Sequence, residues 1–118
     1  MSNSITAVGN LTRDPEVKYL SSGNASAKFG LAVSRRFQKN GEWTEQTSFF
    51  DVVAYGSLAE NIGNSLVKGN KVIVTGRLEQ RTWETDNGDK RSIIEIVADE
   101  AGAALSFATV EVTKNAPK

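Results

Sequence analysis

Apolar and polar residues alternate with a period of two along residues 45–56, EQTSFFDVVAYG. A strand shows this period because successive side chains leave opposite faces of its backbone. One face would carry small apolar side chains suited to a core, and the other would carry Phe49 and Tyr55 with Asp51 between them. The two rings either form a platform that stacks nucleobases or pack on a second sheet or subunit, and this strand alone leaves both possibilities open.

The same alternation predicts strands along most of the chain. Glycines interrupt two of them, at Gly9 and Gly76, and a glycine inside a strand often marks a bulge or a sharp bend. An Asn-Gly pair at the centre of a connecting loop over residues 38–46 predicts a hairpin, and a second Asn-Gly turn falls in residues 86–89. We expect strands over residues 4–13, 25–36, 46–56, 71–83 and 91–99 (the last apolar on both faces), a short extension over 17–20, and a sixth extended segment over 104–113.

One helix is predicted, over residues 58–68. Leucine or isoleucine at positions 58, 62 and 66 would form a narrow apolar stripe along it. Ser57 and Glu60 have the spacing of a capping box, and Gly69 stands where a left-handed residue would end the helix. A helix this short, with one apolar stripe, is expected to cover a sheet.

The order strand, strand, strand, helix, strand, strand is that of the OB-fold, a partly open barrel that binds oligonucleotides or oligosaccharides. We therefore expect an all-β protein: a five-stranded OB-fold barrel with one short helix between strands 3 and 4 and an extra C-terminal strand. Residues 1–113 would form this OB-fold domain, and residues 114–118 a flexible C-terminal end.

The composition removes several classes of function. The chain has 118 residues with no cysteine and no histidine, so Cys/His zinc sites, a Ser-His-Asp triad and imidazole acid–base catalysis are excluded. We expect no catalytic residues, no metal site and no cofactor. No apolar run is long enough for a membrane span and no signal peptide is visible, so no membrane association is expected.

The charge is balanced in sum but not in distribution. The net charge is zero, yet residues 17–41 hold five basic residues and no acidic one, and residues 92–113 hold four acidic residues and no basic one. Because charge acts locally, within a Debye length of about 10 Å, a neutral sum can hide a basic face. The alternative is chance clustering on solvated faces.

Rings and cations share the outward faces of the third and fourth predicted strands. By parity, Phe49 and Tyr55 point outward from the third strand, and Arg77, Arg81 and Trp83 from the fourth. Rings stack bases at about 1–3 kcal/mol per base, and cations neutralise phosphates. The combination favours a flexible single strand over a duplex, whose base faces are hidden.

Two further rings lie near the predicted hairpin. Strict alternation from Phe29 puts Phe37 on the core side, and it reaches the outward face only if the strand ends or bulges near residues 34–36. Trp43, near the tip of the loop, contacts either a ligand or another subunit.

Four segments together resemble the bacterial single-stranded DNA-binding proteins: VGNLTRDPEVKY (residues 8–19), EQTSFFDVVAYGSLAE (45–60), LVKGNKVIVTGRL (66–78) and TWETDNGDKR (82–91). The resemblance covers about residues 3–99, and residues 97–112 resemble the extra C-terminal strand of the actinobacterial subgroup, which clamps neighbouring subunits. The resemblance implies an OB-fold, a homotetramer, and single-stranded DNA wrapped around it without sequence preference.

The family's stacking aromatics fall on Phe37, Phe49, Tyr55 and Trp83, and Phe37 is reached only through the resemblance. Two tryptophans of the family are replaced by phenylalanine, at positions 37 and 49, and phenylalanine can still stack. The candidate nucleic-acid-binding residues are Phe37, Phe49, Tyr55, Trp83, Trp43, Arg35, Arg36, Lys39, Lys71, Arg77, Arg81 and Arg91.

The family usually ends in a flexible tail whose acidic, apolar tip recruits replication and repair proteins, and this chain stops at Lys118 without one. Either the tail is missing from this sequence or the chain is a tail-less paralogue, so the resemblance gives no support for recruiting those partners. We expect a non-enzymatic, cytoplasmic, nucleoid-associated protein that binds and protects single-stranded DNA in replication, recombination or repair. The alternatives are an OB-fold primosome or RNA-binding accessory protein, and a metal-dependent nuclease, which would need Asp51 beside Arg77.

Overall fold

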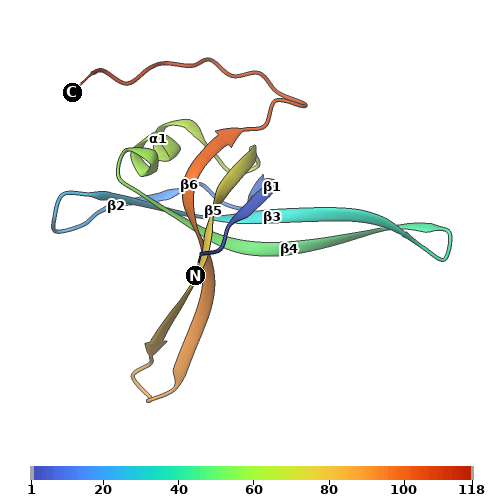
Figure 1. Cartoon of the computed structure of the whole chain (residues 1–118), viewed down its shortest axis with the longest axis horizontal. Coiled ribbons are helices and arrows are strands. Elements are labelled where there is room, and N and C mark those ends of the chain that lie inside the picture. The colour runs from blue at the N-terminus through green and yellow to red at the C-terminus, as the bar shows by residue number, and fades with distance from the viewer. Residues whose placement is uncertain (1, 118) are drawn as a thin grey trace.

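The computed structural model describes residues 2–117 and contains six strands and one helix in that range (Figure 1). The elements in chain order are β1 (Ile5–Leu11), β2 (Glu16–Tyr19), β3 (Ala25–Lys39), β4 (Glu42–Tyr55), α1 (Ser57–Ser65), β5 (Lys71–Glu84) and β6 (Lys90–Ala103).

Five of the strands close into a barrel. The sheet runs in the order β1-β5-β6-β4-β3-β2, and an additional pairing of β1 with β3 joins its two sides. That closing seam is short, with Asn10 opposite Ala32 and Leu11 opposite Leu31. The β4–β6 pairing is parallel, and the other pairings are antiparallel. The predicted five-stranded OB-fold barrel, with its helix between the third and fourth barrel strands, is confirmed.

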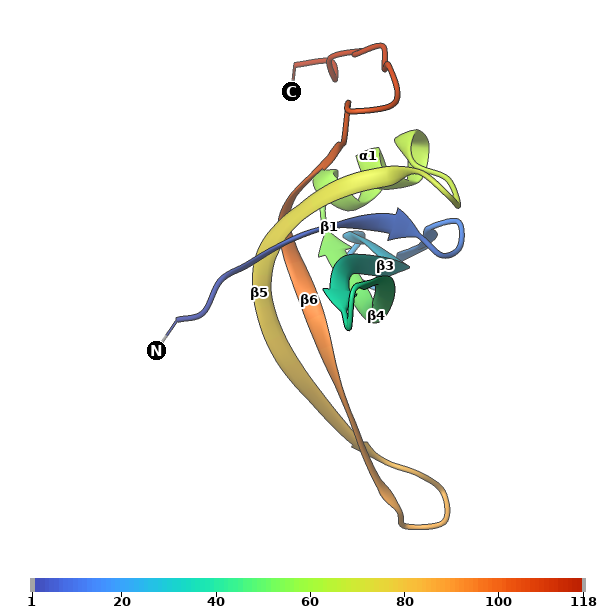
Figure 2. The same ribbon diagram turned by 90° about the vertical axis from the view of Figure 1, so that its right-hand side faces the viewer.

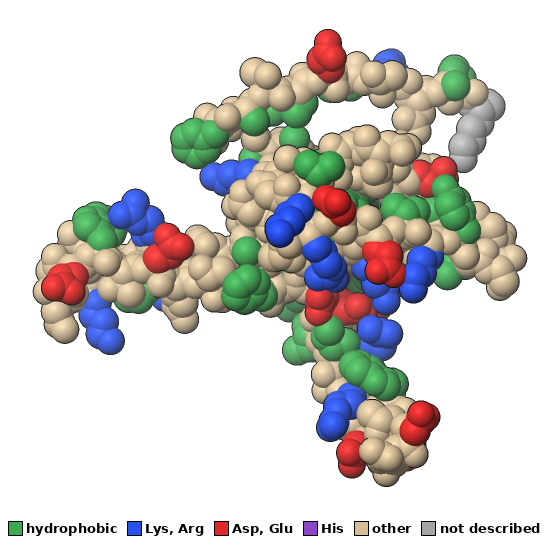
Figure 3. Space-filling model, turned by 180° about the vertical axis from the view of Figure 1, so that it is seen from behind, with side chains coloured by type: hydrophobic (Ala, Val, Ile, Leu, Met, Phe, Trp, Pro, Cys, Tyr) green, Lys and Arg blue, Asp and Glu red, His purple; other side chains and the backbone are tan. Residues whose placement is uncertain are grey.

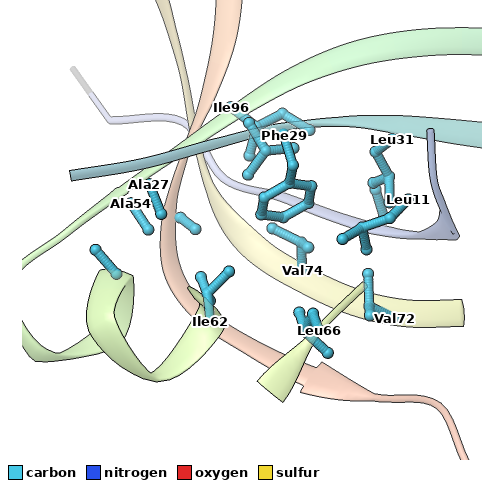
Figure 4. Packing of buried hydrophobic residues seen from close by; sticks show 14 of the residues in the cluster. Leu11, Ala27, Phe29, Leu31, Ala54, Ile62, Leu66, Val72, Val74 and Ile96 are labelled. Atoms are coloured by element: carbon cyan, nitrogen blue, oxygen red, sulfur yellow. The ribbon is translucent and has the colours of Figure 1, made fainter. Parts of the chain in front are cut away.

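The barrel interior is filled by the apolar residues that the period of two selects. Phe29, Leu31, Val52 and Ile96 are each 0–1% exposed, and burying such side chains contributes about 1.5–3 kcal/mol each. Figure 4 shows Ile62 of α1 and Leu66, which follows it, at one end of this cluster, near Val72 and Val74. The helix therefore packs on the sheet, as the sequence predicts, and it does so at one end of the barrel.

Two hairpin arms leave the barrel in different directions (Figures 1 and 2). We call residues 34–47 the β3–β4 arm and residues 79–95 the β5–β6 arm. The predicted loop over residues 38–46 is wrong, because the strands continue to Lys39 and Glu42 and only Asn40 and Gly41 lie between them. These two residues have φ of 54° and 80°, the left-handed values that a tight type I′ hairpin turn requires.

The helix differs from its prediction at both ends. It begins at Ser57 after Gly56, whose φ is 70°, and no side chain caps it, so the capping box is wrong. It ends at Ser65 because Leu66 is extended, with φ −112° and ψ 143°, although its amide still donates to Ile62 O (3.0 Å). The amides that follow find side-chain acceptors: Val67 N donates to Asn70 Oδ1 (3.0 Å) and Lys68 N donates to Asp14 Oδ1 (2.8 Å). Gly69 does have a positive φ of 92°, but in the turn that follows the helix.

The expected extra C-terminal strand is also wrong. Residues 104–117 contain no strand, and within residues 2–117 the sixth strand is β2, which pairs with β3. The segment passes above α1 as an extended chain (Figure 1), and Ala104 N donates to Lys71 O (2.9 Å) where it leaves the barrel. Leu105, Phe107 and Val112 are 62%, 88% and 85% exposed. Extended backbone becomes a strand only beside a partner strand, and a single copy of residues 2–117 supplies none here.

A β-bulge separates the two ends of the β5–β6 pair. Thr75 pairs with Glu100 and Gly76 pairs with Ala98, so Asp99 is the extra residue on β6. A Cβ added to Gly76 would lie 2.9 Å from the Cα of Ala98, so only glycine fits this approach. Beyond the bulge the strands run out of the barrel, and two apolar residues there, Leu78 and Ile94, are 38% and 58% exposed.

Candidate nucleic-acid interface

Three of the predicted stacking rings lie on the outer face of the barrel and its arms. Phe49 is 73%, Tyr55 53% and Trp83 43% exposed. The register places Phe49 and Tyr55 on β4 and Trp83 on β5, on the face away from the core, with β6 between the two strands. Val53 shares that face yet is only 1% exposed, so the exposed rings are separated by packed surface.

Phe37 and Trp43 lie on opposite faces of the β3–β4 arm. Phe37 pairs with Thr44 and Trp43 pairs with Gln38 in a register that is unbroken from Tyr55 to the turn. Because β3 has no bulge near residues 34–36, Phe37 stays on the core side of its strand and does not share a face with Phe49. Trp43 is 64% exposed on the other side.

Guanidinium groups cover several of these rings. The Cζ of Arg35 lies 4.9 Å from the ring centroid of Phe37, and that of Arg36 lies 5.3 Å from Trp43. On the other arm, Arg81 Cζ is 5.2 Å from Trp83. Cation–π contacts at exposed sites contribute about 0.5–1 kcal/mol, so a stacking base can displace them.

The arginines of β5 and β6 contact carboxylates. Arg77 Nε lies 2.6 Å from Glu79 Oε2, and Arg77 Nη1 lies 3.6 Å from Asp99 Oδ1. The hydrogen bond to Glu79 and the charge of that carboxylate raise the pKa of Arg77. The remaining pairs are Arg81 with Glu95 (3.5 Å) and Arg91 with Asp89 (3.9 Å).

The face of the molecule in Figure 3 shows no continuous basic surface. Figure 3 shows Lys and Arg side chains on both arms interspersed with Asp and Glu on the face in view. Phosphates that reach these arginines would exchange with carboxylates already in place. The carboxylates paired with Arg77 and Arg91 are exposed, and such contacts contribute about 0–1 kcal/mol, so a phosphate could replace them at little cost, whereas Glu95, the partner of Arg81, is buried.

Two predicted lysines lie at the edges of this surface. Lys39 is the last residue of β3, at the tip of its arm. Lys71 is the first residue of β5, and its Nζ lies 5.1 Å from the ring centroid of Phe107. Lys71 and Trp83 lie at opposite ends of β5, so the structure does not place Lys71 beside Trp83.

Arg13 is a candidate that sequence reasoning missed. Its Nη2 lies 3.7 Å from Asp51 Oδ1, and the two line a shallow cavity beside Phe49. No local pattern indicates this contact, because the closure of the barrel brings the end of β1 against β3 and β4. Asp51 does not lie beside Arg77, since β6 runs between β4 and β5. The nuclease arrangement is therefore wrong, and residues 2–117 contain no group of three or more Asp or Glu placed to hold a metal ion.

No helix within residues 2–117 has the length and apolar character needed to cross a membrane.

A closed five-stranded barrel with rings and cations on its outer surface places the chain among the OB-fold binding modules. Residues 2–104 match the model of the single-strand binding protein family. The chain belongs to this family.

Similar proteins of known name are single-stranded DNA-binding proteins. The single-stranded DNA-binding protein of Mycolicibacterium smegmatis is 44% identical over 113 residues, which cover 93% of this chain and 68% of the relative. That of Mycobacterium leprae is also 44% identical, over 93% of this chain and 67% of the relative. The crystal structure of the small single-stranded DNA-binding protein from Streptomyces coelicolor superposes with a TM-score of 0.76 at 36% identity, covering 92% of this chain and 99% of that one.

Proposed function

We propose that this protein binds and protects single-stranded DNA, stacking bases on exposed rings while lysines and arginines contact phosphates. The observation that carries the proposal is the exposure of Phe49, Tyr55 and Trp83 on the outer face of one continuous sheet. Exposed large rings are costly to keep in water, and a sequence-tolerant ligand with flat faces would cover them. Family membership supports the same reading.

The phosphate contacts would come from both arms. Arg35, Arg36 and Lys39 lie on the β3–β4 arm, and Arg81 and Arg91 on the β5–β6 arm. Each neutralised phosphate of a single strand contributes about −0.7 to the slope of log affinity against log salt. Because the arginines of β5 and β6 are paired with carboxylates in the free protein, we expect the slope of log affinity against log salt to be shallower than the number of cations in the interface would predict.

The protein would act without catalysis, close to DNA in the cytoplasm, during replication, recombination or repair. It would work as a homotetramer. The exposed apolar side chains of residues 104–113, among them Leu105, Phe107 and Val110, support an assembly because a second copy could cover them. The mass of the free protein in solution, measured by light scattering, tests this: a monomer at micromolar concentration would contradict it.

Binding is tested by fluorescence anisotropy with a labelled oligothymidylate, a duplex of the same length and an RNA strand of matched sequence. We expect much tighter binding to the single-stranded DNA than to the duplex, and affinity that falls as salt rises. Equal affinity for duplex would overturn the proposal, and a clear preference for the RNA would assign the module to RNA instead.

A further inference from the structure

A shallow cavity lies beside Phe49, where the end of β1 meets β3 and β4. Its volume is about 240 Å³, and its polar groups come from Thr12, Arg13 and Asp51. We propose that this cavity reads the Watson–Crick edge of one guanine in a bound strand. The proposal rests on the proposed binding of single-stranded DNA and adds to it a base preference at a single position of an otherwise sequence-tolerant surface.

The cavity exists because position 30 is glycine. Gly30 pairs directly with Asp51 across β3 and β4, so the two residues share a face. A Cβ added to Gly30 would lie 2.8 Å from Arg13 Nη1 and would overlap the hydroxyl of Thr12. Any side chain here would displace the guanidinium, and its absence lets Arg13 lie next to the Asp51 carboxylate.

The polar pair is placed where a stacked base can reach it. Phe49 and Asp51 are two residues apart on one face of β4, which separates them by about 7 Å. Phe49, Asp51 and Arg13 all line the cavity, so a base that stacks on Phe49 would lie within reach of the two charged groups. The ring is 73% exposed, and the Arg13 and Asp51 side chains are 52% and 42% exposed, so all three are accessible.

The Arg13–Asp51 contact is loose enough to admit a ligand. At 3.7 Å between Nη2 and Oδ1 it is longer than a direct hydrogen bond, and the Asp51 carboxylate has acceptor capacity left over. An exposed ion pair of this kind contributes little to the fold, so a base can take over one or both partners.

The pair matches guanine in particular. The two oxygens of a carboxylate accept two parallel hydrogen bonds, and among the DNA bases only guanine offers two adjacent donors, N1–H and N2–H, on its Watson–Crick edge. Its O6 acceptor stands beside them, within the reach of a guanidinium donor such as Arg13. Adenine, cytosine and thymine each offer one donor group on that edge and would leave a carboxylate oxygen unpaired.

The test is a competition measurement on the unmodified protein. The competitors are oligothymidylates in which alternate thymidines are replaced by deoxyguanosine, by deoxyinosine, which lacks the N2 amine, or by 7-deazadeoxyguanosine, which keeps the edge but cannot form quadruplexes. We expect the two guanine strands to bind about five- to tenfold more tightly than the inosine strand. Equal affinity of all strands, with binding to oligothymidylate intact, overturns the guanine site alone; no binding to any strand overturns the proposed function.

Two variants then assign the preference to a residue. Asp51→Asn keeps the shape of the side chain but replaces one acceptor by a donor, so the guanine-over-inosine ratio should fall to about one. Glu60→Gln removes a charge on α1, outside the cavity, and should leave the ratio unchanged. A preference that survives in Asp51→Asn, or falls equally in Glu60→Gln, contradicts the assignment, and thermal unfolding of both variants checks that they are folded.

Discussion

Replacing Phe49 by alanine should separate binding from stability more cleanly than any other single change. The ring is 73% exposed, so only about a quarter of the side chain is buried. Full burial of a phenylalanine contributes about 1.5–3 kcal/mol, so Phe49→Ala should cost about 0.4–0.8 kcal/mol of unfolding free energy. Loss of one stacked base should cost about 1–3 kcal/mol of binding, a fall of about 5- to 150-fold in affinity.

Tyr19 provides the matched control for Phe49. It is 66% exposed on β2, away from the rings of β4 and β5, so Tyr19→Ala removes a comparable ring outside the proposed interface. Fluorescence anisotropy with labelled oligothymidylate at one fixed salt concentration measures affinity, and urea unfolding measures stability. Unchanged affinity in Phe49→Ala, or an equal loss in Tyr19→Ala, would refute the stacking surface.

Two further predictions concern the β5–β6 pair. Glu79→Gln removes the carboxylate that lies 2.6 Å from Arg77, so single-stranded DNA should bind more tightly, and the slope of log affinity against log salt should be steeper by up to about 0.7. Titrations at several salt concentrations measure both quantities, with Glu84→Gln on the same strand as the control. Weaker binding by Glu79→Gln would contradict this prediction. Gly76→Ala should cost about 1–3 kcal/mol of unfolding free energy because its Cβ meets the backbone of Ala98, whereas Gly102→Ala meets nothing within 4 Å; equal urea midpoints for the two variants would show that the bulge tolerates a side chain.

Much of the fold follows from the period of two. Phe29, Leu31, Val52 and Val74 stand at the apolar positions of their strands, and all are buried in the barrel. The lengths of the arms do not follow from it. Residues 38–46 are polar because both faces of that hairpin meet solvent, and a polar stretch of this kind is typical of a loop as well. Only the Asn-Gly turn, with φ positive at both residues, indicates that the strands continue to the tip.

The site was predictable where it depends on neighbours along the chain. Strand parity places Phe49, Tyr55 and Trp83 on the outer face, where the structure has them. The contact between Arg77 and Glu79 has the i, i+2 spacing of one strand face, so this pair too follows from the local sequence. Contacts across the barrel, such as Arg13 with Asp51, depend on how the sheet closes, and no local pattern encodes them.

The short seam between β1 and β3 is held by few hydrogen bonds, and it lies beside the surface where we propose that single-stranded DNA binds. Two residue pairs and the Thr12 amide, which donates to Gly30 O at 2.9 Å, hold the two sides together. A nucleotide that contacted both Arg13, which follows β1, and Phe49 on β4 would bridge the two sides of the seam, and its binding free energy would oppose their separation. Slower hydrogen exchange at Thr12 in the presence of DNA would register that tightening, so occupancy of the surface and integrity of the barrel would rise together.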